Sequence, residues 1–416
     1  MINRPKGTYD ILPSDAHKRN VLFGIIRNVF QRYNYKEILT PAFEQTELFK
    51  RGIGEETDIV SKEMYSFDEG KFTLRPELTA PVIRAYLENS MFNDSPLKKL
   101  FYIGNMFRHE RPQAGRFREF WQFGAEAIGS SDVYIDAEMI AIADSILKEL
   151  NTKDYVVKIN NIGSRDERKD YVKALKDYLQ NHYNDLSETS KTRFEKNPLR
   201  ILDTKDPKEK EIIKNAPTIN NFLKPETQKD FEKLLSLLSV QNIKYEVDYL
   251  LVRGLDYYTN TTFEFQSDKL GAQNAILGGG RYDNLIEILG GKPTPSIGFA
   301  CGIERLLMVA DVSGFKFPEE KNIDLYLITL GDKAKEFALT KINALRQNAF
   351  ICETDFLNRS IKSQMKEANK YNSRYVLVIA DEELNSRTAK LKRMEDGNET
   401  EIRLDDIDSI IKTLQG

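Results

Sequence analysis

The sequence predicts an α+β protein that ends in a separate α/β domain. Three observations predict this class. A strand-like segment reaches a loop containing Pro112 and Gly115 and returns as a second strand. Residues 165–240 are rich in charge and have the texture of helices. From Ile323 onward, strand-like and helical segments alternate, which is the pattern that βα units produce.

Composition limits the kind of protein that this can be. The chain has 416 residues, of which 40% are hydrophobic and 30% charged, so we expect two to three globular domains. No apolar run approaches the ~20 residues that span a bilayer. The N-terminal segment has no apolar or transit-peptide pattern, so we expect a cytoplasmic protein without a membrane partner.

Cysteine, histidine and charge content exclude several kinds of site. Cys301 and Cys352 have no paired spacing, which argues against a disulfide framework and fits a reducing compartment. The three histidines and two cysteines also lack the spacing of a structural zinc site. The net charge of −3 argues against indiscriminate nucleic-acid binding, although a structured RNA could still bind local basic patches.

The N-terminal third is expected to alternate helices and short strands. Hydrophobic residues at helical spacing predict an amphipathic helix over residues 14–33, with Ser14 and Asp15 as candidate N-caps. A short strand over residues 36–40 stops at Pro41, and residues 43–49 lead into the loop RGIGEETD. A strand over 71–75 and helices over 80–87 and 136–150 complete this part.

Residues 106–129 form the most informative segment. With a period of two, Met106, Arg108 and Glu110 share one face of the incoming strand. The two faces of the return strand carry different residues, one polar with Arg118, Phe120, Gln122, Gly124 and Glu126, and one apolar with Trp121, Phe123, Ala125 and Ala127. The apolar face suits a core. Four arginines against two glutamates over residues 106–120 suggest that an anion is held at the polar face.

The second half of the chain carries an interruption, a return to strands and a final domain. We interpret residues 165–240 as a solvated helical insertion, with a role in gripping a long substrate left open. Strand texture returns at residues 245–252 and 259–266, and the run GFKFPEEKN after Ser313 has the composition of a linker. The last domain contains the strand-like runs IDLYLITL, AFICETDF, YVLVIA and TEIRL, with helices between them.

Four further segments combine charge with turn or strand-end positions. They are LRPELT at 74–79, RGLDYY at 253–258, GGGRYD at 278–283, which we interpret as a flexible run opening onto a helix, and SIGFACGIER at 296–305. Taken singly, each has a simple structural explanation: Glu77 suits a helix cap, and adjacent tyrosines suit a half-buried strand. An arginine in the first turn of a helix, such as Arg305, opposes the helix dipole unless it reaches an anion. Taken together, they suggest a pocket for a zwitterion beside a polyphosphate, with Glu126 suited to an ammonium group.

These segments resemble the signatures of class II aminoacyl-tRNA synthetases, and among them the chain resembles the histidyl-tRNA synthetase family along its whole length. The class signatures are the helix and strand ending at Pro41, which in this class form the dimer interface, the FRHE run at 107–110 with its loop and Phe120, and residues 298–305. RGLDYY at 253–258 and GGRYD at 279–283 resemble motifs of the histidyl enzymes. The resemblance implies an antiparallel-sheet catalytic core with a helical insertion, plus a C-terminal α/β anticodon-binding domain.

The resemblance also implies domain boundaries and residue roles. The catalytic core would comprise residues 1–163 and 241–318, the insertion 164–240 and the anticodon-binding domain 323–416. The nucleotide side would use Arg108 and Arg305 on the α- and γ-phosphates of ATP, Arg116 near phosphate, Glu110 on the adenine amino group, Phe120 beneath the ring and Arg253 at the α-phosphate. The histidine side would use Glu77, Leu78, Thr79, Gln122 and Glu126 around the amino acid backbone and its amino group, and Tyr257, Tyr258 and Tyr282 around the imidazole. Gln113 would meet the acceptor end of the tRNA.

The implied activity is ATP-dependent activation of L-histidine to histidyl-adenylate and its transfer to the 3′ end of tRNA(His). Mg²⁺ would accompany ATP, no protein side chain is assigned as a metal ligand, and the working form would be a homodimer. In this reaction a carboxylate attacks a phosphorus, so positioning and charge neutralisation suffice without a protein nucleophile.

Two alternatives remain. Inactive histidine-sensing paralogues regulate the first enzyme of histidine biosynthesis, but they typically lack the C-terminal domain and parts of RGLDYY. A non-catalytic RNA-binding module would leave the ATP-type arginines and the aromatic plate without a purpose.

Overall fold

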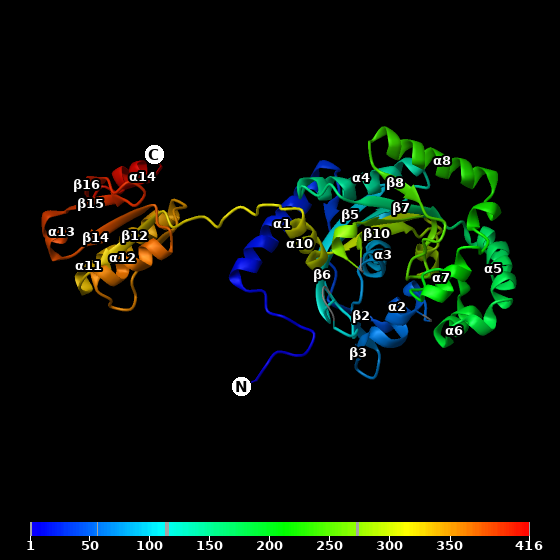
Figure 1. The fold of residues 1–416 in the computed structure, drawn as a ribbon. Coiled ribbons are helices and arrows are strands. Elements are labelled where there is room, and N and C mark those ends of the chain that lie inside the picture. Colours follow the sequence, from blue (N-terminus) through cyan, green and yellow to red (C-terminus); the bar gives the residue numbers. More distant parts are fainter. Residues whose placement is uncertain (1, 56, 113–115, 272–273, 416) are drawn as a thin grey trace. The chain divides into compact units, whose positions relative to one another are not determined.

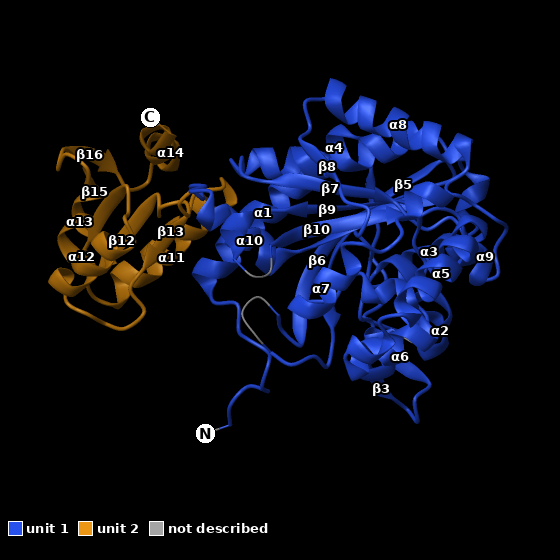
Figure 2. Ribbon diagram, turned by 45° about the vertical axis from the view of Figure 1, so that its right-hand side comes forward, with its two compact units in different colours: residues 1–317 blue, residues 318–416 orange. Residues whose placement is uncertain are grey.

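The computed structural model describes residues 2–55, 57–112, 116–271 and 274–415 (Figure 1). The chain divides into two compact units, residues 1–317 and residues 318–416 (Figure 2). Unit 1 contains a mixed set of helices and strands around a large sheet, and unit 2 has a sheet and core of its own. The predicted α+β class is confirmed.

Unit 1 is built on an eight-stranded sheet with the order β1-β5-β6-β11-β10-β9-β7-β8. Neighbouring strands are antiparallel except for two edge pairs, β1 with β5 and β7 with β8. The strands are β1 Lys36–Glu37, β5 Lys98–Phe107, β6 Glu119–Ile128, β7 Val156–Asn161, β8 Tyr245–Val247, β9 Thr259–Gln266, β10 Ala275–Arg281 and β11 Ser296–Gly302. The expectation of an antiparallel-sheet core is therefore confirmed.

One face of this sheet is buried beneath four helices, α1, α4, α8 and α10. Their bounds are α1 Pro13–Arg32, α4 Val133–Glu149, α8 Pro225–Val240 and α10 Ile303–Val312. Phe30 of α1 stacks on Phe101 with ring centroids 4.5 Å apart and lies edge-on to Phe123 of β6. Large aromatic side chains dominate the energetics of such a core, so the amphipathic pattern of α1 fixes which face of the sheet is covered.

The predicted N-caps of the first helix are wrong. The helix begins one residue earlier, at Pro13, and Leu12 occupies the N-cap position without a side-chain cap. Proline suits the first helical position because its fixed φ is already helical and its missing N–H would have no partner there. Asp15 instead lies in the first turn, where a carboxylate is favoured by the helix dipole.

A small three-stranded sheet and three helices lie next to the other face of the large sheet. The elements are β2 Phe43–Gln45, α2 Thr46–Ile53, the π-helical turn η1 Ile59–Glu63, β3 Tyr65–Phe67, β4 Phe72–Leu74, α3 Thr79–Glu88, the 3₁₀ turn η2 Met91–Asn93 and α9 Leu285–Ile288. The expected loop RGIGEETD, residues 51–58, begins later than predicted, because α2 continues to Ile53. Leu48, Phe49 and Ile53 recur at helical spacing and bury against Ala80 of α3.

Residues 165–240 form a group of helices with a hydrophobic core of their own. The elements are α5 Arg165–Gln180, η3 Tyr183–Asp185, α6 Glu188–Lys196, η4 Pro198–Ile201, α7 Pro207–Ile213, η5 Ile219–Phe222 and then α8. Ser164 and Glu167 form a capping box at the start of α5, and Leu175 and Leu179 on its inner face are fully buried. Helix α8 differs from the rest because Phe231, Leu234 and Leu238 pack into the core beneath the large sheet.

Unit 2 is a five-stranded sheet with the order β13-β12-β14-β15-β16, and its predicted α/β character is confirmed. The first three strands are parallel, whereas β15 and β16 extend the sheet antiparallel. The elements are β12 Leu325–Thr329, α11 Asp332–Gln347, β13 Cys352–Thr354, α12 Ile361–Lys370, β14 Tyr375–Ile379, α13 Asp381–Ser386, β15 Thr388–Arg393, β16 Glu399–Arg403 and α14 Ile407–Gln415. Among the residues described in both units, no helix has the length and apolarity to cross a membrane.

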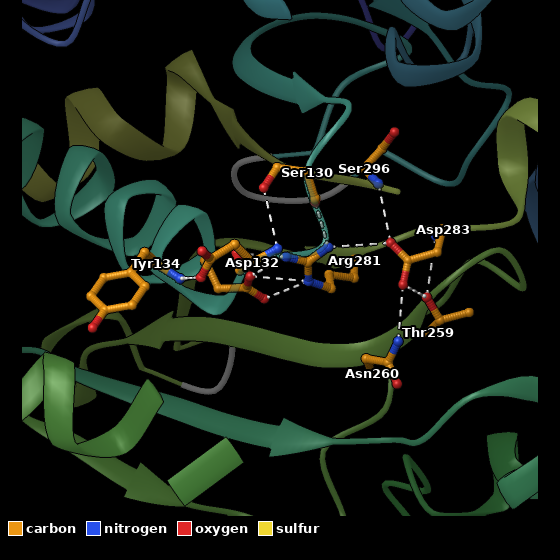
Figure 3. A network of polar contacts seen from close by, with 9 residues as sticks. Ser130, Asp132, Tyr134, Thr259, Asn260, Arg281, Asp283 and Ser296 are labelled. Carbon is orange, nitrogen blue, oxygen red and sulfur yellow. Dashed lines mark hydrogen bonds and ion pairs between the residues drawn. The ribbon is translucent and has the colours of Figure 1, made fainter. Parts of the chain in front are cut away.

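A buried ion pair joins the end of β10 to the start of α4 (Figure 3). The Nε of Arg281 donates to both carboxylate oxygens of Asp136, at 2.9 and 3.0 Å, and its other nitrogens donate to the carbonyls of Ser130 and Asp132. Asp283 accepts from Arg281 and from the backbone N–H of Ser296. The network therefore fixes β10 against α4 and β11 at one end of the sheet.

Replacing Arg281 by methionine should destabilise unit 1 strongly, because it leaves the carboxylate of Asp136 buried without its cation. We expect the free energy of unfolding to fall by about 3–5 kcal/mol. Urea denaturation followed by the fluorescence of Trp121, the single tryptophan of the chain, measures the loss in unit 1. The matched control is Arg32→Met, whose ion pair with Glu149 is exposed and should be worth about 0–1 kcal/mol. Equal losses in the two variants would contradict the assignment.

Candidate active site

A cavity of about 990 Å³ lies in unit 1, on the face of the large sheet opposite the helices of the core. Strand alternation places it there. Phe263 and Phe265 of β9 point into the core, while Glu264 and Gln266 of the same strand line the cavity. The walls come from β5, β6, β9, β10 and β11, from the turn before α3, and from the loop between β8 and β9.

Most of the residues expected to form a site from the sequence meet at this cavity. Its lining includes Glu77, Leu78, Thr79, Arg108, Glu110, Arg116, Phe120, Gln122, Arg253, Tyr257, Tyr258, Tyr282 and Arg305. Glu126 is fully buried directly behind the lining, where it accepts hydrogen bonds from three lining side chains. Gln113 lies outside the described residues.

Arg108 lies at the end of β5 with its guanidinium group over an aromatic ring. Its Nε donates to the carbonyl of Pro76 at 2.9 Å, and its guanidinium carbon is 5.2 Å from the centroid of the Phe120 ring. Burial lowers the pKa of Arg108, and the nearby carboxylates of Glu110 and Glu63 oppose that shift. The expected continuation of the strand through residues 108–110 is wrong, since β5 ends at Phe107. Arginine keeps its charge even when it is buried, so Arg108 places a cation against the face of the Phe120 ring.

Two more cations face this part of the cavity. Arg116 forms an ion pair with Glu110 at 3.2 Å. Burial lowers the pKa of Arg305, and the positive charge of Arg116 lowers it further. Arg305 lies in the first turn of α10, where the helix dipole also disfavours a cation. An anion placed among these groups would relieve both forms of repulsion.

Arg253 enters the cavity from the loop between β8 and β9. It forms an ion pair with Glu264, and its guanidinium carbon lies 6.0 Å from the centroid of the Tyr258 ring. A Cβ on Gly278 would lie 2.4 Å from the Nη2 of Arg253, so glycine allows the guanidinium group to lie directly against the backbone of β10. The expectation that the triple glycine is a flexible run is wrong, because these residues belong to strand β10. The strand expected over residues 245–252 is shorter than predicted, because β8 ends at Val247.

Glu126 of β6 is surrounded by hydroxyl groups. Tyr282 donates to its Oε2 at 2.5 Å, and Thr79 and Tyr102 donate to its Oε1 at 2.8 and 3.3 Å. Burial raises the pKa of Glu126 to about 8, although the hydrogen bonds from Tyr282 and Thr79 oppose that shift. A hydroxyl that donates to Glu126 can still accept a hydrogen bond from a ligand in the cavity, because its oxygen has two lone pairs. This wall therefore offers acceptors to a ligand that carries N–H groups.

Glu77 combines a structural contact with a place in the cavity wall. Its two carboxylate oxygens accept from the backbone N–H groups of Thr79 and Ala80, at 2.7 and 3.0 Å. These are the first two residues of α3, so the carboxylate caps that helix. Burial raises the pKa of Glu77, and the two backbone hydrogen bonds lower it. Glu77 lines the cavity, and each of its carboxylate oxygens can accept a second hydrogen bond. Capping α3 therefore does not prevent Glu77 from binding a cationic group of a ligand.

Several lining residues escaped the interpretation of the sequence. They are Glu63, Tyr102, Asp203, Glu264 and Gln266. The alternation of phenylalanine with polar residues in TNTTFEFQ is the sequence signal that places Glu264 and Gln266 on the face opposite the core. Asp203 belongs to the segment interpreted as a solvated insertion, and nothing in the local sequence indicates that it faces this cavity. Among the described residues, no group of three or more His, Cys, Asp or Glu side chains is arranged to hold a metal ion.

Comparison with known proteins agrees with this geometry. The model of the histidyl-tRNA synthetase family matches residues 7–306, and that of an anticodon binding domain matches residues 324–414. The chain is 50% identical over 406 residues to a histidine–tRNA ligase of Halothermothrix orenii, with 97% of each chain covered. It is 45% identical over 412 residues to a histidine–tRNA ligase of Clostridium novyi, with 98% of each covered.

A solved structure extends the similarity to three dimensions. The crystal structure of apo histidyl-tRNA synthetase from S. aureus superposes with a TM-score of 0.84 at 36% identity, covering 100% of both chains. The sequence and the fold thus agree along both units. The chain belongs to the histidyl-tRNA synthetase family.

Proposed function

We propose that this chain is a histidine–tRNA ligase, which activates L-histidine with ATP and transfers the histidyl group to the 3′ end of tRNA(His). The family uses ATP as a substrate. The observation that carries the proposal is the meeting of Arg108, Arg253 and Arg305, from three separate segments, around one cavity. The same cavity has a wall of phenols backed by a buried carboxylate.

On the nucleotide side, the arginines would neutralise the charge of the reaction. A carboxylate oxygen of histidine attacks the α-phosphorus in line, forming a new P–O bond as the bond to pyrophosphate breaks. Both reactants are anionic, so fixed cations stabilise the transition state more than they stabilise either reactant. Arg253 would exchange its contact with Glu264 for the α-phosphate, Arg305 would hold the γ-phosphate, and Arg116 would lie near phosphate. Glu110 and Phe120 would hold the adenine by its amino group and its face.

We propose that Mg²⁺ arrives with ATP. This ion keeps several waters and is usually bound through substrate phosphates plus one or two carboxylates. Such a mode needs no dedicated cluster of protein ligands, and Glu264 is a carboxylate in the cavity wall that could contribute. When bound, the ion would add positive charge at the departing pyrophosphate.

On the amino acid side, hydroxyls and carboxylates would select histidine. Tyr257, Tyr258 and Tyr282 would surround the imidazole, because their phenols can donate or accept to match its two nitrogens. Glu77, Thr79, Gln122 and Glu126 would hold the backbone and the ammonium group, with Leu78 beside them. A site built from buried polar groups rejects analogues that leave those groups unpaired, so discrimination needs no second editing site.

We also propose the arrangement of domains and partners. Residues 1–163 and 241–318 would form the catalytic core, with the insertion at 164–240, and residues 323–416 would bind the anticodon of tRNA(His). Gln113 would contact the acceptor end. The working form would be a homodimer that uses the surface of α1 and of the segment from β1 to Pro41, in which Leu39 is largely exposed in the single chain. A sedimentation experiment that gives the mass of one chain would contradict the proposed dimer but not the proposed arrangement of domains.

The substrate spectrum of ATP–pyrophosphate exchange provides the first test. We expect exchange with histidine and none with the other amino acids, because only histidine satisfies the phenols and carboxylates of the cavity. Histidine binding without any exchange would instead support the histidine-sensing regulator. Charging of a tRNA(His) transcript and of a transcript with another anticodon would then test the second step.

Replacing Arg253 by alanine should lower kcat for exchange by about 10²–10³, since one preorganised cation at the reacting phosphate is worth that much. The KM for histidine should change little. The matched control is Lys191→Ala, whose ion pair with Glu188 lies on the surface of the insertion. Thermal denaturation would verify that both variants fold. Unchanged turnover in Arg253→Ala would remove this residue from the proposed role.

Histidine binding should release a proton from Glu126. The pKa of its carboxyl is raised to about 8 in the free protein, so the group is mainly protonated at pH 7. An ammonium group nearby favours the carboxylate and lowers that pKa. The affinity for histidine should therefore rise between pH 6 and 8 through this group. Calorimetric titration at pH 7 in two buffers of different ionisation enthalpy measures the release, which should disappear in Glu126→Gln. The same release in both proteins would exclude Glu126 as its source.

A further inference from the structure

The helical insertion contacts RGLDYY through a cluster of hydrogen bonds at Asp256. The Nη2 of Arg200 lies 3.1 Å from Asp256 Oδ1 and 3.0 Å from the carbonyl oxygen of Gly254. The Nδ2 of Asn197 donates to the same Oδ1 at 3.0 Å. Both donors belong to the insertion, at the end of α6 and in the turn η4. Two donors thus hold the loop at Gly254 and Asp256, next to Arg253.

The same loop is anchored from the catalytic core. The backbone N–H of Asp256 donates to the carbonyl of Ile53, the last residue of α2, at 3.3 Å. The next residue, Gly54, has a φ of +103°, and a Cβ there would lie 2.7 Å from Asp256 Oδ2. The chain therefore requires glycine at this position both for its conformation and for the space that Asp256 occupies. Asp256 lies where the core, the insertion and RGLDYY meet.

The donors themselves are fixed to the hydrophobic core of the insertion. Arg193 of α6 donates to the carbonyl of Arg200 at 3.1 Å, and Ile201 of η4 is fully buried. The chain then continues as Leu202–Lys205, which line the catalytic cavity. Thr204 in that segment is bound to the buried carboxylate of Glu209. A displacement of the insertion would therefore move Arg200 and part of the cavity wall together.

We propose that Arg200 is a positioning residue for Arg253: by holding Asp256 and the carbonyl of Gly254, it fixes the backbone from which Arg253 reaches the reacting phosphate. The proposal rests on the function proposed above. It makes the docking of the insertion a condition for full activity of the core, and it gives residues 197–200 a task beyond folding the insertion.

The energetics of the contact suit this role better than a role in stability. The side chains of Arg200 and Asp256 are 15% and 33% exposed, so their ion pair is partly solvated and contributes little to folding. Positioning is more demanding, since a displacement of ~1 Å in a reacting group can cost 10²-fold in rate. Arg253 lies against the backbone at Gly278, with its guanidinium carbon 6.0 Å from the centroid of the Tyr258 ring, so the position of its Cα determines how far the guanidinium group reaches. A shift of its Cα would therefore move the guanidinium group away from the phosphate.

A double-mutant cycle in ATP–pyrophosphate exchange with histidine tests the proposal. Arg200→Ala should lower kcat about tenfold in the wild-type background, because the lost interaction acts in the transition state. In the Arg253→Ala background the same substitution should lower kcat less than about twofold, since residues that act through one another are not additive. Arg200→Lys should recover part of the rate, because both contacts are made by the single nitrogen Nη2 and an ammonium group can donate to the same two acceptors, although it lacks the planar guanidinium group.

Tyr178→Phe is the matched control within the insertion. The hydroxyl of Tyr178 donates to the carbonyl of Ile212 at 2.7 Å, and neither residue lines the cavity, so its loss tests destabilisation of the insertion alone. We expect this variant to lower the melting temperature at least as much as Arg200→Ala while leaving kcat unchanged. A tenfold loss from Arg200→Ala in both backgrounds, or no loss in the wild-type background, would overturn the proposal. Absence of histidine-dependent exchange in the wild type would instead overturn the proposed function itself.

Discussion

Each central strand of the eight-stranded sheet has to bury one row of side chains beneath α1, α4 and α10, and this constraint leaves the opposite row free to carry charge. On β9 the buried row holds Phe263 and Phe265, and the opposite row holds Glu264 and Gln266. On β6 the buried row holds Phe123, and the opposite row holds Glu126. Burying carboxylates and guanidinium groups together costs free energy, and the packing of the apolar row on the other face of the sheet offsets that cost.

Glycines supply the space that this second row requires. A Cβ on Gly298 would lie 1.7 Å from Glu126 Oε2, and one on Gly124 would lie 2.3 Å from the hydroxyl of Tyr102. Gly278 does the same for Arg253. These glycines lie on three strands, β11, β6 and β10. Ligand groups and side chains can thus approach the backbone of the sheet closely, which an ordinary strand surface would prevent.

Local patterns predicted much of this molecule. Period-two alternation gave the faces of the hairpin, helical spacing gave α1, and the succession of strand-like and helical runs gave the α/β character of unit 2. The family resemblance placed Arg108, Arg253 and Arg305 together, which no spacing in the sequence could do. Errors arose where long-range contacts decide the structure. Residues 46–53 form a helix that packs against Ala80, and the triple glycine pairs with β9 and β11 as part of β10.

The insertion shows why the remaining contacts were not predictable. The charges of Arg200 and Asp203 look like those of any solvated helix, and the sequence contains no local mark of their partners. Asp256 is more than fifty residues along the chain from Arg200. Contacts of this kind are set by how two separately packed cores meet, so only the folded arrangement reveals them.

The strand order has a consequence for how the protein comes to be folded. β6 ends at Ile128, yet its neighbour on one side is β11, which begins at Ser296. During synthesis the hairpin of β5 and β6 therefore leaves the ribosome with an unpaired edge, and it must wait for well over a hundred residues before that edge is covered. Non-local pairing of this kind slows folding. A nascent chain halted before β11 would expose that edge of β6 to pairing with another chain.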